Sequence, residues 1–388
     1  MENRPIAMTP PMGWNSWNTF GETVNEQLIK DAADVMVDSG LKDAGYEYVV
    51  IDDCWALKER DASGRMVADP VKFPSGMKAL ADYIHSKGLK FGMYSCNGVR
   101  TCADYPGSFD HEFIDAKTFA EWGVDFLKYD NCFKPINASG ENLYRRMAMA
   151  LRNCGREILF SACNWGTDNV EKWIRSSGAH MYRSTGDISD TWESIKRLGL
   201  SQIDKINYSG SFCFNDIDML VVGMYGKGDC INVLHNVQGG CTDIEYRTHF
   251  AFWAIMNSPL MIGCDIRDMN AATKDILLNK DLIAINQDIE GRNPFEVSGL
   301  NSNPTEHRIL IKTLSNGEYA IGLFNFADKK RHMCLYLYDI GLPISSGYGM
   351  ELYDCLEHKS AGVVKEMINE RIEPHDCKVY RAKLVPIK

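Results

Sequence analysis

Short apolar runs that resemble buried strands alternate with amphipathic helical patterns along the first three quarters of the chain. The strand patterns lie near residue 14 and at 46–53, 90–95, 124–130, 158–163, 181–187, 214–220 and 258–263. Helical patterns, in which apolar residues recur every three to four positions, separate the first five strands at 25–40, 75–88, 114–123 and 141–155. This alternation predicts parallel strands joined by crossover helices.

The number of these units favours one architecture. About eight strand–helix units occupy roughly 290 residues, and a (β/α)8 TIM barrel typically takes about 250. A doubly wound open sheet is the alternative, but its dinucleotide-binding form is disfavoured because no GxGxxG follows a strand pattern. We therefore predict an α/β fold with a catalytic (β/α)8 barrel over residues 1–290.

The remaining segment, 291–388, shows a different sequence pattern. Its apolar stretches run or alternate as strands, without a convincing helix between them, at 308–314, 318–326, 331–340 and 377–385. The tripeptide SNG at 315–317 is typical of a hairpin turn. The sequence predicts a small C-terminal domain built as an antiparallel β-sandwich.

Composition and charge restrict the partners of the chain. Its 388 residues carry a formal net charge of −10 and no run of Lys or Arg, which disfavours a nucleic-acid surface. The longest apolar stretch, at 250–256, is far shorter than the roughly 20 residues of a membrane span. The first residues lack the apolar region of a signal peptide. We expect a cytoplasmic protein, and leave a secreted mature form and a homo-oligomer open.

Charged and aromatic residues gather at the C-terminal ends of the predicted strands, where barrel enzymes place their chemistry. In chain order they are Trp14, Trp17, Asp52, Asp53, Tyr94, Lys128, Asp130, Asn164, Trp165, Arg183, Asp187, Asp216 and Asp218. A single Asp at such a position is more often a helix cap or an ion-pair partner than a catalyst. A purely structural barrel has no use for so many charges at one rim, so we infer a functional site.

The residue types at this rim favour a sugar ligand. Hydroxyl groups of a pyranose suit charged, fork-like partners such as Asp, Lys and Arg, and the apolar face of the ring suits a flat aromatic such as Trp17. Two carboxylates across a glycosidic bond can act as nucleophile and as proton donor. From the residues alone, Asp187, Asp216 and Asp218 remain equal candidates for the proton donor.

Lys128 and Asp130 lie two residues apart on one predicted strand, so their side chains share a face and point to the mouth of the barrel. At about 4 Å and an effective dielectric constant near 20, an ammonium favours a carboxylate by about 4 kcal/mol. We therefore expect Lys128 to hold Asp130 ionised, as a nucleophile requires. The alternative is a buried structural ion pair, which would be costly at this position.

Six motifs occur here in an order and spacing that resemble glycoside hydrolase family 27, the α-galactosidases and α-N-acetylgalactosaminidases. They are PPMGWNSW, IDDCW, DFLKYDNC, CNWG, RSTGDI and NDIDML. The resemblance covers residues 8–290 closely and the β-rich tail more loosely. It implies a barrel followed by an antiparallel β-sandwich, and hydrolysis of terminal α-linked galactose with retention of configuration.

The resemblance also implies roles for single residues. By position in the motifs, Asp130 resembles the nucleophile, and Asp187 the general acid and then base. Asp52 and Asp53 look like the pair that binds the 4- and 6-hydroxyls of galactose. Three further implied sugar contacts are Lys128 at the 3- and 4-hydroxyls, Arg183 at the 2-hydroxyl and Trp17 against the ring. Additional pocket residues by the same resemblance are Tyr94, Asn164, Trp165 and Asp218. Cys102 and Cys132 fall where the family commonly carries a disulfide.

Four alternatives remain. Many family members carry Glu where this chain has Asn164, next to the 2-substituent, and members that prefer N-acetylgalactosamine use small residues in this region, so an α-N-acetylgalactosaminidase stays open. A β-L-arabinopyranosidase also stays open, although the presence of both Asp52 and Asp53 favours galactose. A metal-dependent hydrolase would want His at strand ends, and His85, His111 and His180 lie away from them. A sugar-binding protein without activity would be expected to lack Asp130 or Asp187.

The expected reaction is a double displacement on a galactose-terminated oligosaccharide or glycoconjugate, with the two carboxyl groups about 5–5.5 Å apart. No metal or organic cofactor is expected. The 13 cysteines show no CxxC or Cys/His spacing, which disfavours a zinc site.

Overall fold

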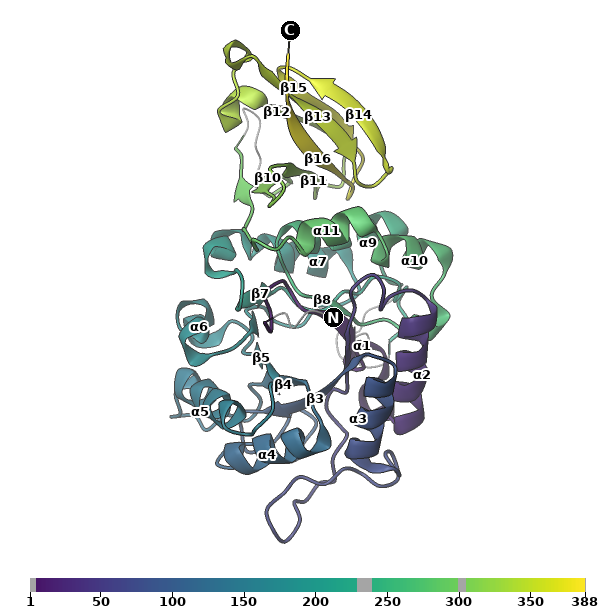
Figure 1. The fold of residues 1–388 in the computed structure, drawn as a ribbon, viewed down its shortest axis with the longest axis vertical. Coiled ribbons are helices and arrows are strands. Elements are labelled where there is room, and N and C mark those ends of the chain that lie inside the picture. The colour runs from purple at the N-terminus through teal and green to yellow at the C-terminus, as the bar shows by residue number, and fades with distance from the viewer. Residues whose placement is uncertain (1–4, 229–238, 299–304, 388) are drawn as a thin grey trace.

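The computed structural model describes residues 5–228, 239–298 and 305–387, and its first part is a ring of parallel strands (Figure 1). The strands are β1 (Met12–Asn15), β2 (Tyr48–Val50), β3 (Lys90–Cys96), β4 (Phe126–Asp130), β5 (Leu159–Cys163), β6 (Met181–Arg183), β7 (Phe214–Asp216) and β8 (Leu260–Ile262). They pair in the order β7-β6-β5-β4-β3-β2-β1-β8. Leu220, just after β7, closes the ring, because its N–H donates to Met261 O at 2.7 Å and its carbonyl accepts from Gly263 N at 2.9 Å.

Helices surround the strands on the outside of this ring (Figure 1). They are α1 (Trp17–Phe20), α2 (Glu26–Asp38), α3 (Gly76–Ser86), α4 (Glu112–Trp122), α5 (Gly140–Arg152), α6 (Ile174–Ser177), α7 (Trp192–Leu200), α9 (Asp243–Ile255), α10 (Ala271–Leu277) and α11 (Lys280–Asn286). Several begin at a side-chain cap. Asn25 accepts from Leu28 N at the start of α2, and Thr242 and Glu245 form a capping box at the start of α9.

The second part of the chain is an all-β domain. Its strands are β9 (Phe295–Glu296), β10 (His307–Thr313), β11 (Tyr319–Asn325), β12 (Arg331–Tyr336), β13 (Tyr348–Asp354), β14 (Lys359–Val364), β15 (Met367–Ile372) and β16 (Cys377–Pro386). They form a six-stranded sheet, β14-β13-β16-β11-β10-β9, and a two-stranded sheet, β12-β15, both antiparallel. Apolar side chains from the two sheets share one core, so the sheets are packed face to face.

Helix α9 joins the two parts of the structure. Every residue from Phe250 to Ile255 is buried, so this half of the helix has no face toward water. On one side the helix packs on the barrel. On the other, the Phe252 ring lies 5.0 Å from the ring of Phe324 and 5.4 Å from that of Phe326, both in the β-domain. The two parts of the chain therefore share a continuous hydrophobic core.

The prediction of a (β/α)8 barrel followed by an antiparallel β-sandwich is confirmed. The predicted division after residue 290 falls in the segment between α11, which ends at Asn286, and β9, which begins at Phe295. Among the described helices, none combines the length and the apolar character that crossing a membrane requires.

Candidate active site

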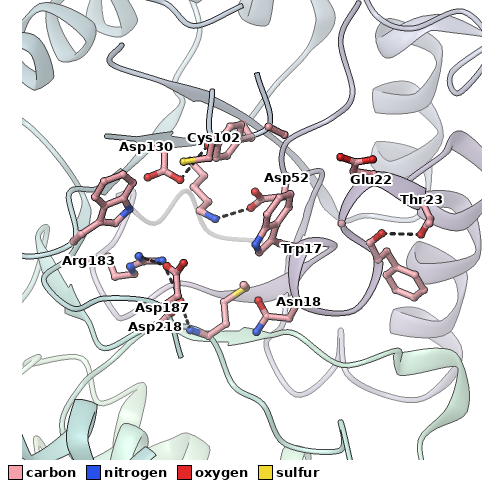
Figure 2. A pocket seen from close by; sticks show the side chains of 17 residues that line it. Trp17, Asn18, Glu22, Thr23, Asp52, Cys102, Asp130, Arg183, Asp187 and Asp218 are labelled. Atoms are coloured by element: carbon pink, nitrogen blue, oxygen red, sulfur yellow. Dashed lines mark hydrogen bonds and ion pairs between the residues drawn. The ribbon is translucent and has the colours of Figure 1, made fainter. Parts of the chain in front are cut away.

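A cavity of about 510 Å³ opens at the C-terminal ends of the barrel strands (Figure 2). Among the strand-end residues predicted from the sequence, all line it except Trp14, Asp53, Asn164 and Asp216, and Cys102 lines it as well. The lining residues are Trp17, Asn18, Phe20, Gly21, Glu22, Thr23, Asp52, Tyr94, Cys102, Ala103, Lys128, Asp130, Trp165, Arg183, Asp187, Asp218 and Met219. The structure thus brings most of the predicted residues into one cavity.

Asp130 is the last residue of β4, and only 7% of it is exposed. Its carboxylate accepts a hydrogen bond from the Tyr94 hydroxyl at 3.1 Å and one from the backbone N–H of Asn131 at 2.8 Å. Burial raises the pKa of Asp130, and the positive charges of Lys128 and Arg183 oppose that shift without cancelling it. Lys128 favours the ionised form of Asp130 as expected, but burial outweighs its cationic neighbours, so the net shift of the Asp130 pKa is upward.

The ion-pair partner of Lys128 differs from the expected one. Its Nζ lies 2.7 Å from Oδ2 of Asp52, which also accepts a hydrogen bond from Asn15 Nδ2 at 2.7 Å. Burial is the largest single effect and lowers the pKa of Lys128, but Asp52, Cys163 and Asp130 together outweigh it, so the pKa of Lys128 is raised. The direct pairing of Lys128 with Asp130 was therefore a wrong prediction. Lys128 still lowers the pKa of Asp130 through the electrostatic effect of its charge, because both side chains face the same cavity.

Arg183 connects two other carboxylates. It ends β6, and its guanidinium contacts Oδ1 of Asp187 and lies 3.5 Å from Oδ1 of Asp218. Asp218 also accepts hydrogen bonds from the N–H groups of Ile188 and Met219, at 2.7 and 2.8 Å, so it fixes the loop that carries Asp187. The Asp187 side chain is 52% exposed, in contrast to the buried Asp130. Asp187 can therefore meet a group that enters from solvent.

Asp216 is a third carboxylate of this group, at the end of β7. It does not line the cavity but accepts a hydrogen bond from the N–H of Asp218 at 2.9 Å. Burial and the neighbouring Asp218 charge raise the pKa of Asp216 to about 7. This geometry separates Asp216 from the other two candidates for a proton donor, which the sequence pattern alone had left equal.

Two predicted pocket residues, Asp53 and Asn164, are held by hydrogen bonds to neighbouring groups and are not among the residues that line the cavity. Asp53 accepts hydrogen bonds from the backbone N–H groups of Cys54 at 2.8 Å and Ala103 at 3.1 Å, and burial raises its pKa to about 6. Asn164 is fully buried, and its side-chain oxygen accepts from the Thr167 hydroxyl at 3.1 Å. Their predicted sugar contacts stay predictions.

A disulfide joins the loops that follow β3 and β4. Cys102 and Cys132 are bonded, with their Cα atoms 5.2 Å apart, as the family resemblance implied. The Tyr94 hydroxyl that donates to Asp130 also lies 3.7 Å from Sγ of Cys132. The disulfide therefore supports the wall of the cavity directly beside Asp130.

One part of the cavity wall was not predicted from the strand ends. Residues 18–23 follow the short strand β1 and form α1 and η1 (Gly21–Thr23), so no charged strand end marks them. The signal available in the sequence was the polar segment between the predicted first strand and the helix pattern that starts near residue 25. Met219 was also not predicted, because an apolar residue next to a predicted site Asp is usually interpreted as part of the hydrophobic core.

Comparison with known proteins connects this cavity with a family. Residues 9–288 match the family model described as "Alpha galactosidase A", and residues 304–382 match that of an α-galactosidase C-terminal β-sandwich domain. The chain belongs to this α-galactosidase family. Its members are glycoside hydrolases, and the predicted family 27 resemblance is confirmed.

Individual relatives agree with this assignment. The α-galactosidase of Cyamopsis tetragonoloba is 42% identical over 97% of this chain and 86% of its own length. The structure of α-galactosidase I from Mortierella vinacea superposes with a TM-score of 0.88 at 34% identity, covering 98% of each chain. A β-L-arabinopyranosidase from Geobacillus stearothermophilus superposes with a TM-score of 0.85 at 25% identity, covering 97% of each chain. The same architecture thus serves two glycosidase activities.

Proposed function

We propose that this enzyme hydrolyses terminal α-linked D-galactose by a retaining double displacement. The observation that carries the proposal is the placement of Asp130 and Asp187 in one sugar-sized cavity, one carboxylate buried and the other open to solvent. The names of the relatives support galactose as the sugar. The substrate class is a galactose-terminated oligosaccharide or glycoconjugate.

In the first step, an oxygen of the Asp130 carboxylate attacks the anomeric carbon and forms a galactosyl ester. The bond to the leaving oxygen breaks, and Asp187 gives that oxygen its proton. In the second step, Asp187 takes a proton from water, and the water oxygen displaces Asp130 to release α-galactose. Two inversions give retention, and the mechanism requires carboxyl groups about 5–5.5 Å apart.

Arg183 gives Asp187 a way to change between its two roles. In the empty site the guanidinium contacts Asp187 and so favours its charged form. A sugar hydroxyl that accepts a hydrogen bond from Arg183 would draw this cation away from Asp187. The carboxyl group would then be better able to hold the proton that the leaving oxygen needs.

A β-L-arabinopyranosidase is the second candidate, and the superposition on the enzyme of that name with a TM-score of 0.85 supports it. Arabinopyranose lacks the hydroxymethyl group that Asp53 is expected to help bind. Initial rates on p-nitrophenyl α-galactoside, its 2-acetamido analogue and p-nitrophenyl β-L-arabinopyranoside separate the possibilities. Fastest release from the galactoside is expected. A preference for either other glycoside would overturn the proposed sugar.

Asp130→Asn tests the nucleophile. We expect kcat to fall about a thousandfold or more, because no other carboxylate can replace a covalent nucleophile. Asp216→Asn is the matched control, since it removes a buried carboxylate at the same rim that does not line the cavity. A loss of less than tenfold in Asp130→Asn, or an equal loss in both variants, would refute the assignment.

The stereochemical course provides an independent test. Proton NMR of the first product should show α-galactose before mutarotation. With Asp130→Gly and added azide, the small anion should occupy the vacated space and form β-galactosyl azide in one inversion. Initial release of β-galactose from the wild-type enzyme would refute double displacement.

A further inference from the structure

The outward face of the two-stranded sheet in the β-domain carries a cluster of three polar side chains. His332 and Cys334 lie two residues apart on β12, so their side chains share one face of the strand. Asn369 of β15 lies directly opposite Cys334 in the antiparallel register. The neighbouring residues Met333 and Ile368 belong to the core between the two sheets. The three polar side chains therefore point away from that core.

The polar atoms of this cluster lie at the mutual distances that metal ligands adopt. Sγ of Cys334 is 3.7 Å from Nε2 of His332 and 3.4 Å from Oδ1 of Asn369. Ligands of a tetrahedral zinc ion lie about 2.0–2.3 Å from the metal, and therefore about 3.3–3.8 Å from one another. Nε2 of His332 and Oδ1 of Asn369 are in direct contact. Because both of these side chains are exposed, rotation of either one can admit an ion between the three atoms.

The types of atom in the cluster select the class of ion. A thiolate and an imidazole nitrogen are ligands of zinc and related transition metals, whereas calcium and magnesium take oxygen ligands. The amide oxygen of Asn369 can fill a third position and water the fourth. Arg371, opposite His332 in the register, disfavours a cation, but the thiolate that Cys334 forms on binding brings a compensating negative charge. The cluster therefore suits a thiophilic divalent cation.

Cys334 differs from the other free cysteines in its surroundings. In the described parts of the chain, Cys154 and Cys334 are the free cysteines that are not buried. The Cys154 thiol donates to the backbone carbonyls of Leu151 at 3.0 Å and Arg156 at 3.3 Å. Cys334 instead has an imidazole and an amide oxygen beside it. The sequence pattern, which lacks CxxC, did not indicate this cluster because its third member comes from another strand.

The two strands that carry the cluster form a small sheet of their own. Within the described residues β12 pairs with β15, while β13 and β14, which lie between them in the chain, belong to the six-stranded sheet (Figure 1). A two-stranded sheet is only marginally stable by itself in water. An ion held by Cys334 on one strand and Asn369 on the other would cross-link them. Because the unfolded chain does not hold the three ligands together, such an ion would stabilise the folded domain.

We propose that His332, Cys334 and Asn369 form a binding site for a thiophilic divalent cation of the zinc type, with water as the fourth ligand. On binding, the Cys334 thiol releases its proton to solvent, and His332 binds through Nε2 as the neutral imidazole with its proton on Nδ1. The site lies outside the cavity at the mouth of the barrel and takes no part in the proposed reaction. Its role is to hold the two strands of the small sheet together.

Titration of the metal-free, full-length protein with Co²⁺ tests the site. Co²⁺ adopts the coordination of zinc and gives a thiolate-to-metal charge-transfer band when a cysteine is among its ligands. We expect this band to saturate at one ion per chain in the wild type and in the control Cys154→Ser, and to be absent in Cys334→Ser. His332→Gln should weaken Co²⁺ binding by about tenfold or more. No band in the wild type, or a band that survives in Cys334→Ser, would refute the site.

Thermal unfolding tests the cross-link between the strands. With Zn²⁺ in excess, the Tm of the wild type and of Cys154→Ser should rise by at least about 2 °C, while that of Cys334→Ser stays unchanged. Circular dichroism of the metal-free variants confirms that each one is folded, and His332→Gln provides a second ligand variant with the same expected loss of the Tm shift. Arg371→Gln should tighten Co²⁺ binding, because it removes a neighbouring positive charge. No rise in the Tm of the wild type, or an equal rise in Cys334→Ser, would overturn the proposal.

Discussion

Lys312 makes the stability of this protein depend on pH. It lies in β10, is fully buried, and donates hydrogen bonds to Asn257 Oδ1 and to the carbonyl of Ile285, both in the barrel. Burial lowers the pKa of Lys312 from 10.5 to about 7, with the Asp288 charge opposing. Within the described residues, the hydrogen bonds of this buried amine thus go to neutral oxygens, and Asp288 acts on it only as a nearby charge. This arrangement predicts a defined pH response.

The sign and size of the change in the free energy of unfolding with pH follow from proton linkage. Below pH 7 the amine is charged in both states, and the folded state bears the full cost of burying it. Between pH 7 and 10.5 the folded protein has released the proton and the unfolded chain still holds it, so stability rises with pH. One proton gives about 1.4 kcal/mol per pH unit at most, which amounts to about 2 kcal/mol between pH 7 and 9.

Urea unfolding at pH 7, 8 and 9 measures this effect by comparison with Lys312→Met. From pH 7 to pH 9, the free energy of unfolding of the wild type should rise by about 2 kcal/mol relative to that of the variant. Asn257→Asp is the second variant, because a carboxylate beside the ammonium should raise its pKa again and remove the slope. Asn257 has a left-handed backbone with φ of 57°, which Asp tolerates. Equal slopes for the wild type and Lys312→Met would refute the reasoning.

Two further predictions concern the active site. Lys128→Met should move the acid limb of the kcat/KM profile to higher pH, because Lys128 lowers the pKa of Asp130 against burial; a limb that stays in place or shifts to lower pH would contradict this. Replacing Cys102 and Cys132 together with Ser should cost about 3–4 kcal/mol of stability, since the disulfide closes a loop with a sequence separation of 30. The wild type treated with a reductant should lose the same amount in thermal melts, while the double variant should be insensitive.

The barrel could be predicted because each of its strands and helices leaves a pattern in a short stretch of sequence. Each strand pattern is followed by a helix pattern, and that alternation leaves few topologies. The shared face of Lys128 and Asp130 was also predictable, since alternation along a strand sets it, and both side chains line the cavity. A local sequence pattern does not show which side chain from another strand pairs with Lys128. Asp52 is held by Asn15 on β1, and that contact places its oxygen 2.7 Å from Lys128.

For Asp53, strand geometry and the family resemblance predict different surroundings. If the alternation of the strand continued past Val50, Asp52 and Asp53 would face opposite ways, and only one of them would reach a ligand. The family resemblance placed both on the sugar. In the structure Asp53 is bound by backbone N–H groups, including that of Ala103 from a loop 50 residues away. A contact of that range depends on how the loops after β2 and β3 pack, and neither strand pattern carries that information.

The fully buried half of α9 limits how this chain can be divided or recombined. A fragment ending at residue 290 would expose Phe252, which now packs on Phe324 and Phe326 of the β-domain. It would also leave the side-chain oxygen of Asn257 without Lys312. Exposed aromatic surface of this kind promotes aggregation. Chimeras that exchange the C-terminal domain among relatives must therefore carry a matching apolar surface, and the β-sandwich is inherited together with the helix that it covers.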